Sequence, residues 1–129
     1  MTMQPRRFLI TGGSQGIGAA IVQHARTAGH QVVFTGRNES HLDATAKATG
    51  ANGIRADVAS DTDNQRVVDH CLSAMGGIDV LINNAGVGYN AEIGALDVTA
   101  MRNLFATNVF GMVDLTNRIV PLSAPISAL

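Results

Sequence analysis

The chain is poor in several residue types, and each shortage narrows what it can be. Its 129 residues include one cysteine, no tryptophan and 4% aromatic residues. The single Cys71 has no partner for an internal disulfide, as is typical of proteins in the reducing cytoplasm. No apolar run approaches the roughly 20 residues that span a bilayer as a helix. We therefore expect a cytoplasmic protein without a membrane span.

Charge is scarce as well. Charged residues make up 15% of the chain, the net charge is −1, and no run of Lys or Arg occurs. Nucleic acids and acidic membranes are bound mainly by clustered positive charge, so neither is expected as a partner. The apolar stretch after Arg6 and Arg7 is too short for a signal peptide. The four histidines are scattered, without the spacing of metal ligands, and no metal site is expected.

What the chain does have is 46% hydrophobic residues and a regular alternation of strand-like and helix-like segments. Length and composition predict one domain over residues 1–129. Short apolar segments predict strands at 7–11, 31–35, 53–58 and 78–83. Apolar spacing and capping residues predict helices at 16–28, 40–49, 61–75 and 98–120. This alternation predicts an α/β fold, a doubly wound parallel sheet with helices on both faces.

A glycine-rich turn, Thr11 to Gly18, joins the first predicted strand to the first predicted helix. Gly12 would permit the tight turn, Gly16 would let the backbone approach a pyrophosphate, and Gly18 would let the helix pack closely on the strand. Free N–H groups and the helix dipole favour an anion there. Such a loop can also be glycine-rich for steric reasons alone. Because a strand precedes the turn and a helix follows it, nucleotide binding is the better interpretation.

Four motifs in order resemble the short-chain dehydrogenase/reductase family. The spacing Thr11-Gly12-x-x-x-Gly16-Ile17-Gly18 is looser than G-x-G-x-x-G and similar to the turn of that family. After it come three further matches: Asp57-Val58, similar to the adenine-pocket pair; Asn83-Asn84-Ala85-Gly86, similar to the NNAG motif; and Asn108, similar to the active-site Asn of the long helix. Together the motifs extend over nearly the whole chain.

The resemblance implies a Rossmann-like sheet in strand order 3-2-1-4, incomplete relative to the family, and a nicotinamide dinucleotide as cofactor. It implies carbonyl reduction or alcohol oxidation in the family, with Asn108 in a supporting role. The expected cofactor-binding residues are Thr11, Gly12, Ser14, Gln15, Gly16, Ile17, Gly18, Arg37, Asn38, Asp57, Val58, Asn83, Ala85 and Gly86.

The end of the second predicted strand bears on the choice of cofactor. A carboxylate there would hydrogen-bond the ribose 2′-OH and repel a 2′-phosphate. This chain has Gly36 instead, followed by Arg37, whose guanidinium suits a phosphate. We therefore expect NADP(H) rather than NAD(H), with a solvated loop cation as the alternative for Arg37. Many relatives that prefer NADP(H) also carry a basic residue where this chain has Gln15.

The family's catalytic Ser and its Tyr-x-x-x-Lys pair have no counterpart in this sequence. The only Tyr is Tyr89 and the only Lys is Lys47, far apart and on different predicted elements. Ser123 and Ser127 follow the last predicted helix without a fifth strand to position them. The lysine of such a pair lowers the pKa of the tyrosine. Catalysis by the chain alone is therefore doubtful. Three interpretations remain open: part of an oxidoreductase, a non-catalytic NADP(H)-binding protein, or an association module.

The last predicted helix carries more apolar residues than a four-stranded sheet can cover. They lie on more than one face: Leu104, Phe105, Val109, Phe110, Met112, Val113 and Leu115. In the family that the chain resembles, this helix packs against a partner subunit. We expect a homo-oligomer that associates through residues 98–120.

Overall fold

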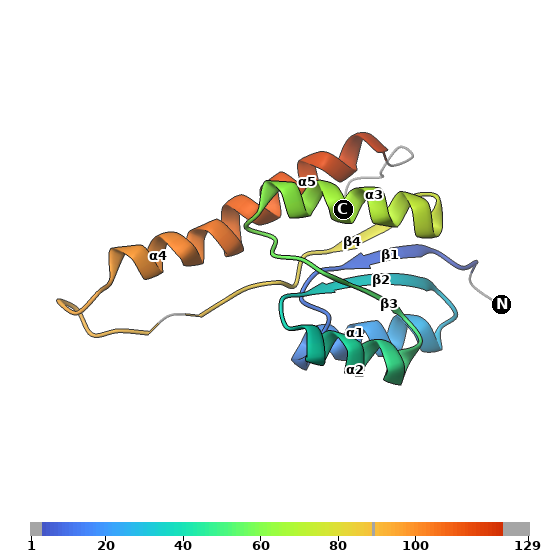
Figure 1. The fold of residues 1–129 in the computed structure, drawn as a ribbon, viewed down its shortest axis with the longest axis horizontal. Helices are drawn as coiled ribbons and strands as arrows, with labels where there is room; N and C mark the ends of the chain where they lie inside the picture. Colours follow the sequence, from blue (N-terminus) through green and yellow to red (C-terminus); the bar gives the residue numbers. More distant parts are fainter. Residues whose placement is uncertain (1–3, 89, 123–129) are drawn as a thin grey trace.

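A parallel sheet forms the centre of the computed structural model, which describes residues 4–88 and 90–122 (Figure 1). Its four strands lie in the order β3-β2-β1-β4. Their bounds are β1 Arg7–Ile10, β2 Gln31–Gly36, β3 Asn52–Arg55 and β4 Val80–Ile82. In the middle of the sheet, Leu9 aligns with Val33 on one side and with Leu81 on the other. The predicted parallel sheet and its strand order are confirmed.

Helices cover both faces of this sheet, as predicted. On one face lie α1 (Gly16–Thr27) and α2 (Glu39–Thr49), and on the other lie α3 (Asp61–Met75) and α5 (Met112–Ile119) (Figure 1). Successive strand residues enter opposite cores because side chains alternate along a strand. The α1–α2 core contains Ile10, Val22, Val32, Phe34 and Leu42. The α3–α5 core contains Leu9, Val33, Val67, Val68, Leu115 and Ile119.

The third strand is shorter than predicted, and the next helix begins differently. β3 ends at Arg55 instead of residue 58. Beyond it, the N–H of Asp57 donates to the carboxylate of Asp63 at 2.9 Å, which turns the chain out of the sheet. The cap of α3 is Ser60, whose hydroxyl accepts from the N–H of Asp63 at 3.1 Å. Residues 61–63, expected as the cap, form the first turn instead.

The buried face of α1 also differs from the expectation. Helical spacing of the apolar residues in this segment predicts that Ile17, Ala20, Ile21 and Ala25 face inward, but the Ile17 side chain is 76% exposed. The buried residues are Gly18, Val22 and Ala25. Gly18 lies against the Gly12 carbonyl. The face of the helix that points inward therefore starts one residue later than the sequence pattern indicates.

The predicted helix 98–120 is interrupted by a turn of a different type. It consists of α4 (Val98–Phe105), the π-helical turn η1 (Ala106–Gly111), α5, and the 3₁₀ turn η2 (Val120–Leu122). π-helical turns accommodate an extra residue and are frequent at functional sites. Two contacts coincide with this turn: the Asn108 side chain pairs with the backbone of Val87, and Gly111 lies against the Val58 carbonyl.

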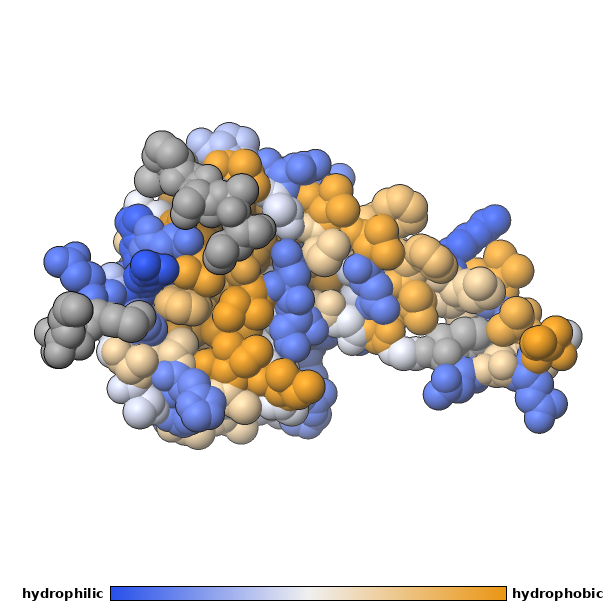
Figure 2. Space-filling view, turned by 180° about the vertical axis from the view of Figure 1, so that it is seen from behind, coloured by the Kyte–Doolittle hydropathy of each residue, from blue (hydrophilic) through white to orange (hydrophobic). Residues whose placement is uncertain are grey.

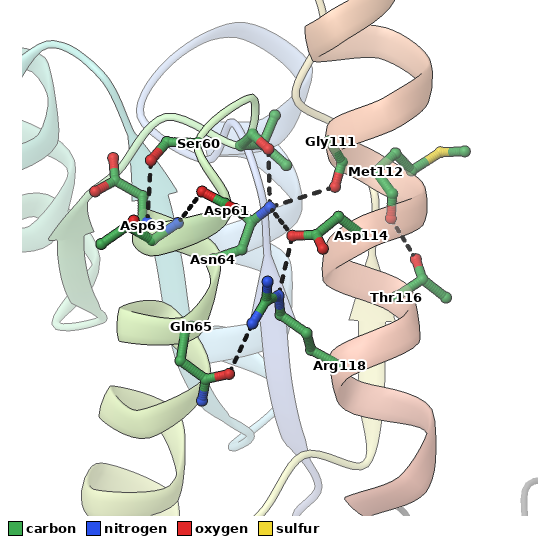
Figure 3. A network of polar contacts seen from close by, with 12 residues as sticks. Ser60, Asp61, Asp63, Asn64, Gln65, Gly111, Met112, Asp114, Thr116 and Arg118 are labelled. Atoms are coloured by element: carbon green, nitrogen blue, oxygen red, sulfur yellow. Dashed lines mark hydrogen bonds and ion pairs between the residues drawn. The ribbon is translucent and has the colours of Figure 1, made fainter.

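Polar contacts fix α5 on α3 but leave α4 outside the body (Figures 1 and 3). The buried Asn64 amide donates to the Val58 carbonyl and to the Asp114 carboxylate, both at 2.9 Å. The Arg118 guanidinium donates to Asp114 at 3.0 Å and to Gln65 at 2.9 Å. Hydrogen bonds from Arg118 and then Asn64 lower the pKa of Asp114. By contrast, α4 has no buried residue and projects as an arm.

An ion pair ties β1 to the start of β4, and it makes stability depend on pH. Arg7 donates to both carboxylate oxygens of Asp79 at 2.9 Å. These bonds lower the pKa of Asp79 from its ordinary 3.8 to about 2. A lowered carboxyl pKa stabilises the fold above the unfolded value, and this contribution is lost as pH falls through the folded value. Because both side chains are about a third exposed, the effect is that of a surface pair.

We expect Asp79→Asn to lower the free energy of unfolding at neutral pH. The difference from the unmodified chain should persist down to about pH 4, shrink as the pH falls toward 2 and disappear below about pH 2, where Asp79 is protonated in both states. Urea denaturation followed by circular dichroism across this range measures it. Replacement of the exposed Asp43 by Asn serves as the control. Parallel curves for Asp79→Asn and the unmodified chain at all pH values would contradict the prediction.

Candidate functional site

A cavity of about 230 Å³ lies at the carboxyl ends of β1, β2 and β4. In parallel sheets, ligands bind at this edge, in the crevice where the strand order reverses. Segments far apart in the sequence line it together: Gly12, Ser14, Gln15, Thr35, Arg37, Ala56, Asp57, Val58, Asn84, Ala85, Gly86, Val87 and Thr107.

The Thr11 hydroxyl joins the turns after β1 and β4 behind this cavity. Its Oγ1 accepts hydrogen bonds from the backbone N–H groups of Asn84 and Ala85, each at 3.0 Å. It also donates to the Ile82 carbonyl at 3.4 Å. A hydroxyl can donate once and accept twice, so all its bonding capacity is used. Thr11 is 2% exposed and supports the cavity wall without lining it.

Two glycines of the first turn are required by close packing. Gly12 has φ +65°, and a Cβ on it would stand 2.9 Å from the Cα of Ala85. A Cβ on Gly18 would overlap the carbonyl oxygen of Gly12, which also accepts a 2.9 Å hydrogen bond from the side chain of Asn84. The turn after β1, the turn after β4 and the start of α1 therefore meet without room for side chains.

The start of α1 is suited to a phosphate group. Gly16 has φ +59°, and a Cβ on it would meet nothing within 4 Å, so its backbone faces open space. The N-cap residue Gln15 contributes no side-chain cap bond, and the first turn contains no acidic residue. The first N–H groups of a helix without a cap are available to an anion, which the helix dipole also favours.

Asp57 lines the cavity beyond the end of β3, and the Asp63 carboxylate holds its backbone. The N–H of Ala59 donates to Asp57 at 2.9 Å, which orients the Asp57 carboxylate. The backbone N–H of Asp57 donates to Asp63, and this bond is the main reason why the pKa of Asp63 is lowered. Arg37 lines the same cavity as Asp57 and is exposed directly after β2. No carboxylate of the described residues 4–88 and 90–122 forms an ion pair with Arg37.

Eight of the expected cofactor-binding residues line the cavity: Gly12, Ser14, Gln15, Arg37, Asp57, Val58, Ala85 and Gly86. Of the other six, Thr11, Gly16 and Gly18 belong to the glycine-rich turn behind or beside the cavity. The remaining three lie elsewhere. Asn38 caps α2, because its side chain accepts from the N–H of His41 at 3.0 Å. Asn83 is exposed and donates to the Thr116 hydroxyl of α5 at 3.3 Å. Ile17 is exposed beside the turn.

Asn108 stands next to the cavity but not in its wall. Its side chain accepts from the N–H of Val87 and donates to the Val87 carbonyl, both at 2.8 Å. These two hydrogen bonds fix the segment after β4. Gly86 belongs to this segment, and a Cβ on it would stand 3.2 Å from the Asn108 side chain. Asn108 thus positions the segment that lines the cavity.

Five lining residues were not among those expected: Thr35, Ala56, Asn84, Val87 and Thr107. Asn84 belongs to the quoted NNAG motif and could have been chosen for its central place there. Thr107 could not have been found, because the π-helical turn that brings it to the cavity leaves no clear pattern in the sequence. Tyr89, Ser123 and Ser127 lie outside the described residues.

Two kinds of feature are absent from the part of the chain that the structure describes. None of its helices is long and apolar enough to cross a membrane. Nor does it contain a group of three or more His, Cys, Asp or Glu residues that could hold a metal ion. His30 is buried, where its Nδ1 accepts from the N–H of Arg6 at 3.0 Å and its ring packs against Phe8.

Comparison with known proteins agrees with this geometry. The sequence pattern of the short chain dehydrogenase family matches residues 6–124. The chain belongs to this family. It is 39% identical to human retinol dehydrogenase 8 in an alignment 127 positions long, which covers 94% of this chain and 41% of that protein. The chain spans about two fifths of the length of the curated relatives it matches.

Solved structures of the family superpose on the chain. A short-chain dehydrogenase from Streptomyces avermitilis has a TM-score of 0.86 and 33% identity, over 93% of this chain and 45% of that one. The 3-ketoacyl-(acyl-carrier-protein) reductase from Brucella melitensis, complexed with NADH, has a TM-score of 0.87 and 26% identity. It is matched over 91% of this chain and 49% of its own.

We expect Thr11→Val to destabilise the chain by about 2 kcal/mol, because two partly buried N–H groups lose their acceptor. The replacement keeps the shape of the side chain, so a packing effect is minimised. Chemical denaturation measures the loss. Thr11→Ser, which keeps the hydroxyl, is the matched control and should retain most of the stability. Equal losses for the Val and Ser variants would contradict the role given to the hydroxyl.

Proposed function

We propose that residues 1–129 form a domain that binds NADP(H), as the cofactor-binding part of a short-chain dehydrogenase/reductase-type oxidoreductase. The observation that carries the proposal is one cavity lined by the glycine-rich turn, Arg37, Asp57 and the segment after β4. The bound nicotinamide would supply or accept the hydride in carbonyl reduction or alcohol oxidation. The NADH complex of the Brucella reductase, a protein similar to this chain, agrees with the cofactor class.

The proposed roles of the residues follow from their places around the cavity. The backbone at Gly16 and the start of α1 would hold the pyrophosphate. Asp57 and Val58 would contact the adenine, and Ala85 and Gly86 would face the rest of the cofactor. Asn108 would act by holding Val87 in place.

The end of β2 supports NADP(H) over NAD(H). Gly36 offers no carboxylate to a ribose 2′-OH, and the exposed Arg37 guanidinium lines the same cavity. A guanidinium binds phosphate through several charge-assisted hydrogen bonds. This part of the proposal goes beyond the comparisons, since the related Brucella reductase was crystallised with NADH.

We further propose that these 129 residues do not turn over a substrate on their own. The only lysine, Lys47, lies exposed on α2, and the only tyrosine is Tyr89. A proton-transferring tyrosine needs its lysine close enough to lower its pKa. The alternative function is a non-catalytic NADP(H)-binding or association module. An assay that follows the absorbance of NADPH in the presence of a panel of ketones and aldehydes distinguishes a catalytic chain from this alternative.

Fluorescence titration should give tighter binding of NADPH than of NADH. Arg37→Gln should weaken NADPH binding by about tenfold to a hundredfold, because a charge-assisted contact to the 2′-phosphate is lost. NADH binding should change little. Arg102→Gln on the projecting α4 removes the same charge away from the cavity and is the matched control.

Three results would contradict the proposal in different parts. Failure of both cofactors to bind would reject the site. Equal affinities for NADPH and NADH would reject the preference alone. Turnover of any carbonyl compound by the 129 residues would reject their proposed inactivity.

We also propose that the chain forms a homo-oligomer through residues 98–120. Leu115 is buried, but other apolar residues of this segment are exposed: Phe105, Val109, Phe110, Met112, Val113 and Val120. Apolar side chains extend along the projecting arm in the space-filling view (Figure 2). Large exposed apolar patches often mark protein interfaces. The polar anchoring of α5 on α3 would hold this surface in a fixed orientation.

We expect Phe110→Glu to shift the chain toward the monomer, because a charge would be buried in the proposed interface. Phe110 is 69% exposed, so the fold itself should tolerate the change. Light scattering at micromolar concentration measures the mass. Leu72→Glu, at another exposed apolar side chain on α3, is the control and should not alter the mass. A monomeric unmodified chain would contradict the prediction.

We propose a cytoplasmic location, for which cell fractionation is the test.

Cys71 is buried as a free thiol, and burial raises its pKa to about 12. Such a thiol is unreactive and serves as a core residue. The expected absence of a nucleic-acid partner stays a prediction.

A further inference from the structure

An asparagine interrupts the otherwise apolar buried face of α3. The buried residues of this helix are Asn64, Val67, Val68 and Cys71, which have the spacing of a single helix face. Asn64 is 2% exposed, so its side chain occupies a place where an apolar residue would pack. A buried amide is costly unless its donors find acceptors. The partners of this amide therefore account for the choice of residue.

The amide nitrogen of Asn64 joins three segments of the chain. It donates to the Val58 carbonyl and to the Asp114 carboxylate, both at 2.9 Å, with a longer contact of 3.5 Å to the Gly111 carbonyl (Figure 3). All three partners are acceptors, which identifies this side-chain atom as the NH₂ group. The two N–H groups of one side chain thus connect the segment after β3 with α5.

Val58 lies beyond the last residue of β3, where strand pairing has ended. β3 ends at Arg55, and the segment after it lines the cavity with Ala56, Asp57 and Val58. The Val58 carbonyl accepts its hydrogen bond from Asn64, which is not part of the cavity wall. A side chain outside the cavity therefore holds a residue that lines it.

We propose that Asn64 is a positioning residue for the adenine end of the cofactor, which acts by holding Val58 in the cavity wall. This inference rests on the proposed function, in which Asp57 and Val58 contact the adenine. The Asp114 carboxylate contributes by fixing the plane of the Asn64 amide, since the two N–H groups of one amide cannot turn independently. A shift of Val58 would change the adenine contact and leave the start of α1, which would hold the pyrophosphate, in place.

Two variants separate this role from general stabilisation of the fold. Asn64→Leu keeps the branch at Cγ but removes the donors to Val58 and Asp114. Arg118→Met is the matched control, because it removes the bonds of Arg118 to Asp114 and Gln65 and keeps the Asn64 amide. Binding of NADPH, NADH and ADP-ribose is titrated by calorimetry well below the melting temperature of each variant, and thermal unfolding is measured without ligand.

We expect both variants to lower the melting temperature, but only Asn64→Leu to weaken binding, by about tenfold. The factor should be the same for NADPH, NADH and ADP-ribose, because all three carry the same adenine. By contrast, Arg37→Gln should affect NADPH alone. A residue that only stabilises the fold changes the melting temperature, but not the affinity of chains that are already folded.

Unchanged affinity of Asn64→Leu for ADP-ribose, or an equal loss in Arg118→Met, would overturn the inference. If Asn64→Leu does not fold, NMR of the unmodified chain decides: the side-chain amide signals of Asn64 should shift when ADP-ribose is added, and unchanged signals overturn the inference. If the unmodified chain binds NADPH and NADH equally, only the cofactor preference fails, since ADP-ribose tests Asn64 without it. If it binds none of the three ligands, the proposed function fails and the inference with it.

Discussion

The Thr11 hydroxyl holds together the two turns on which the cavity depends. β1 and β4 are neighbours in the sheet but lie some 70 positions apart in the chain, as the Thr11–Ile82 bond reflects. Their turns can form one wall only if the backbone groups beyond the strands find partners, because buried N–H groups are costly when unpaired. Thr11 satisfies two of them with one side chain, and Asn84 returns a bond to the Gly12 carbonyl.

The contact between these two turns explains why part of the architecture was predictable. The glycine-rich turn and the NNAG motif follow directly after apolar strands, so the sequence placed both at the same edge of a parallel sheet. Eight expected residues accordingly line one cavity. The expected residues that do not line the cavity share a cause: a motif indicates which segment lies at the site, but not which side chains line it. Ile17, Asn38 and Asn83 belong to the right segments and point elsewhere.

Other features depend on distant contacts and were beyond a reading of local patterns. The strand after α2 ends at Arg55 because Asp63, from the following helix, takes the N–H of Asp57. The predicted helix 98–120 contains a π-helical turn where it contacts Val87 and Val58. Helical spacing alone favours a continuous α-helix there. The interruption brings Thr107 to the cavity, and α4 projects beyond it.

The same dependence on distant contacts applies to the end of β2. A sequence comparison would treat position 36 as an independent choice between glycine and a carboxylate. In the structure it is tied to Ser14, and the Ser14 backbone is tied to Thr45 of α2. Protein interiors are close-packed, so a side chain added at one point must displace something at another. A side chain at the end of β2 would therefore require the facing turn to shift, and the same packing shapes the part of the cavity that Arg37 lines.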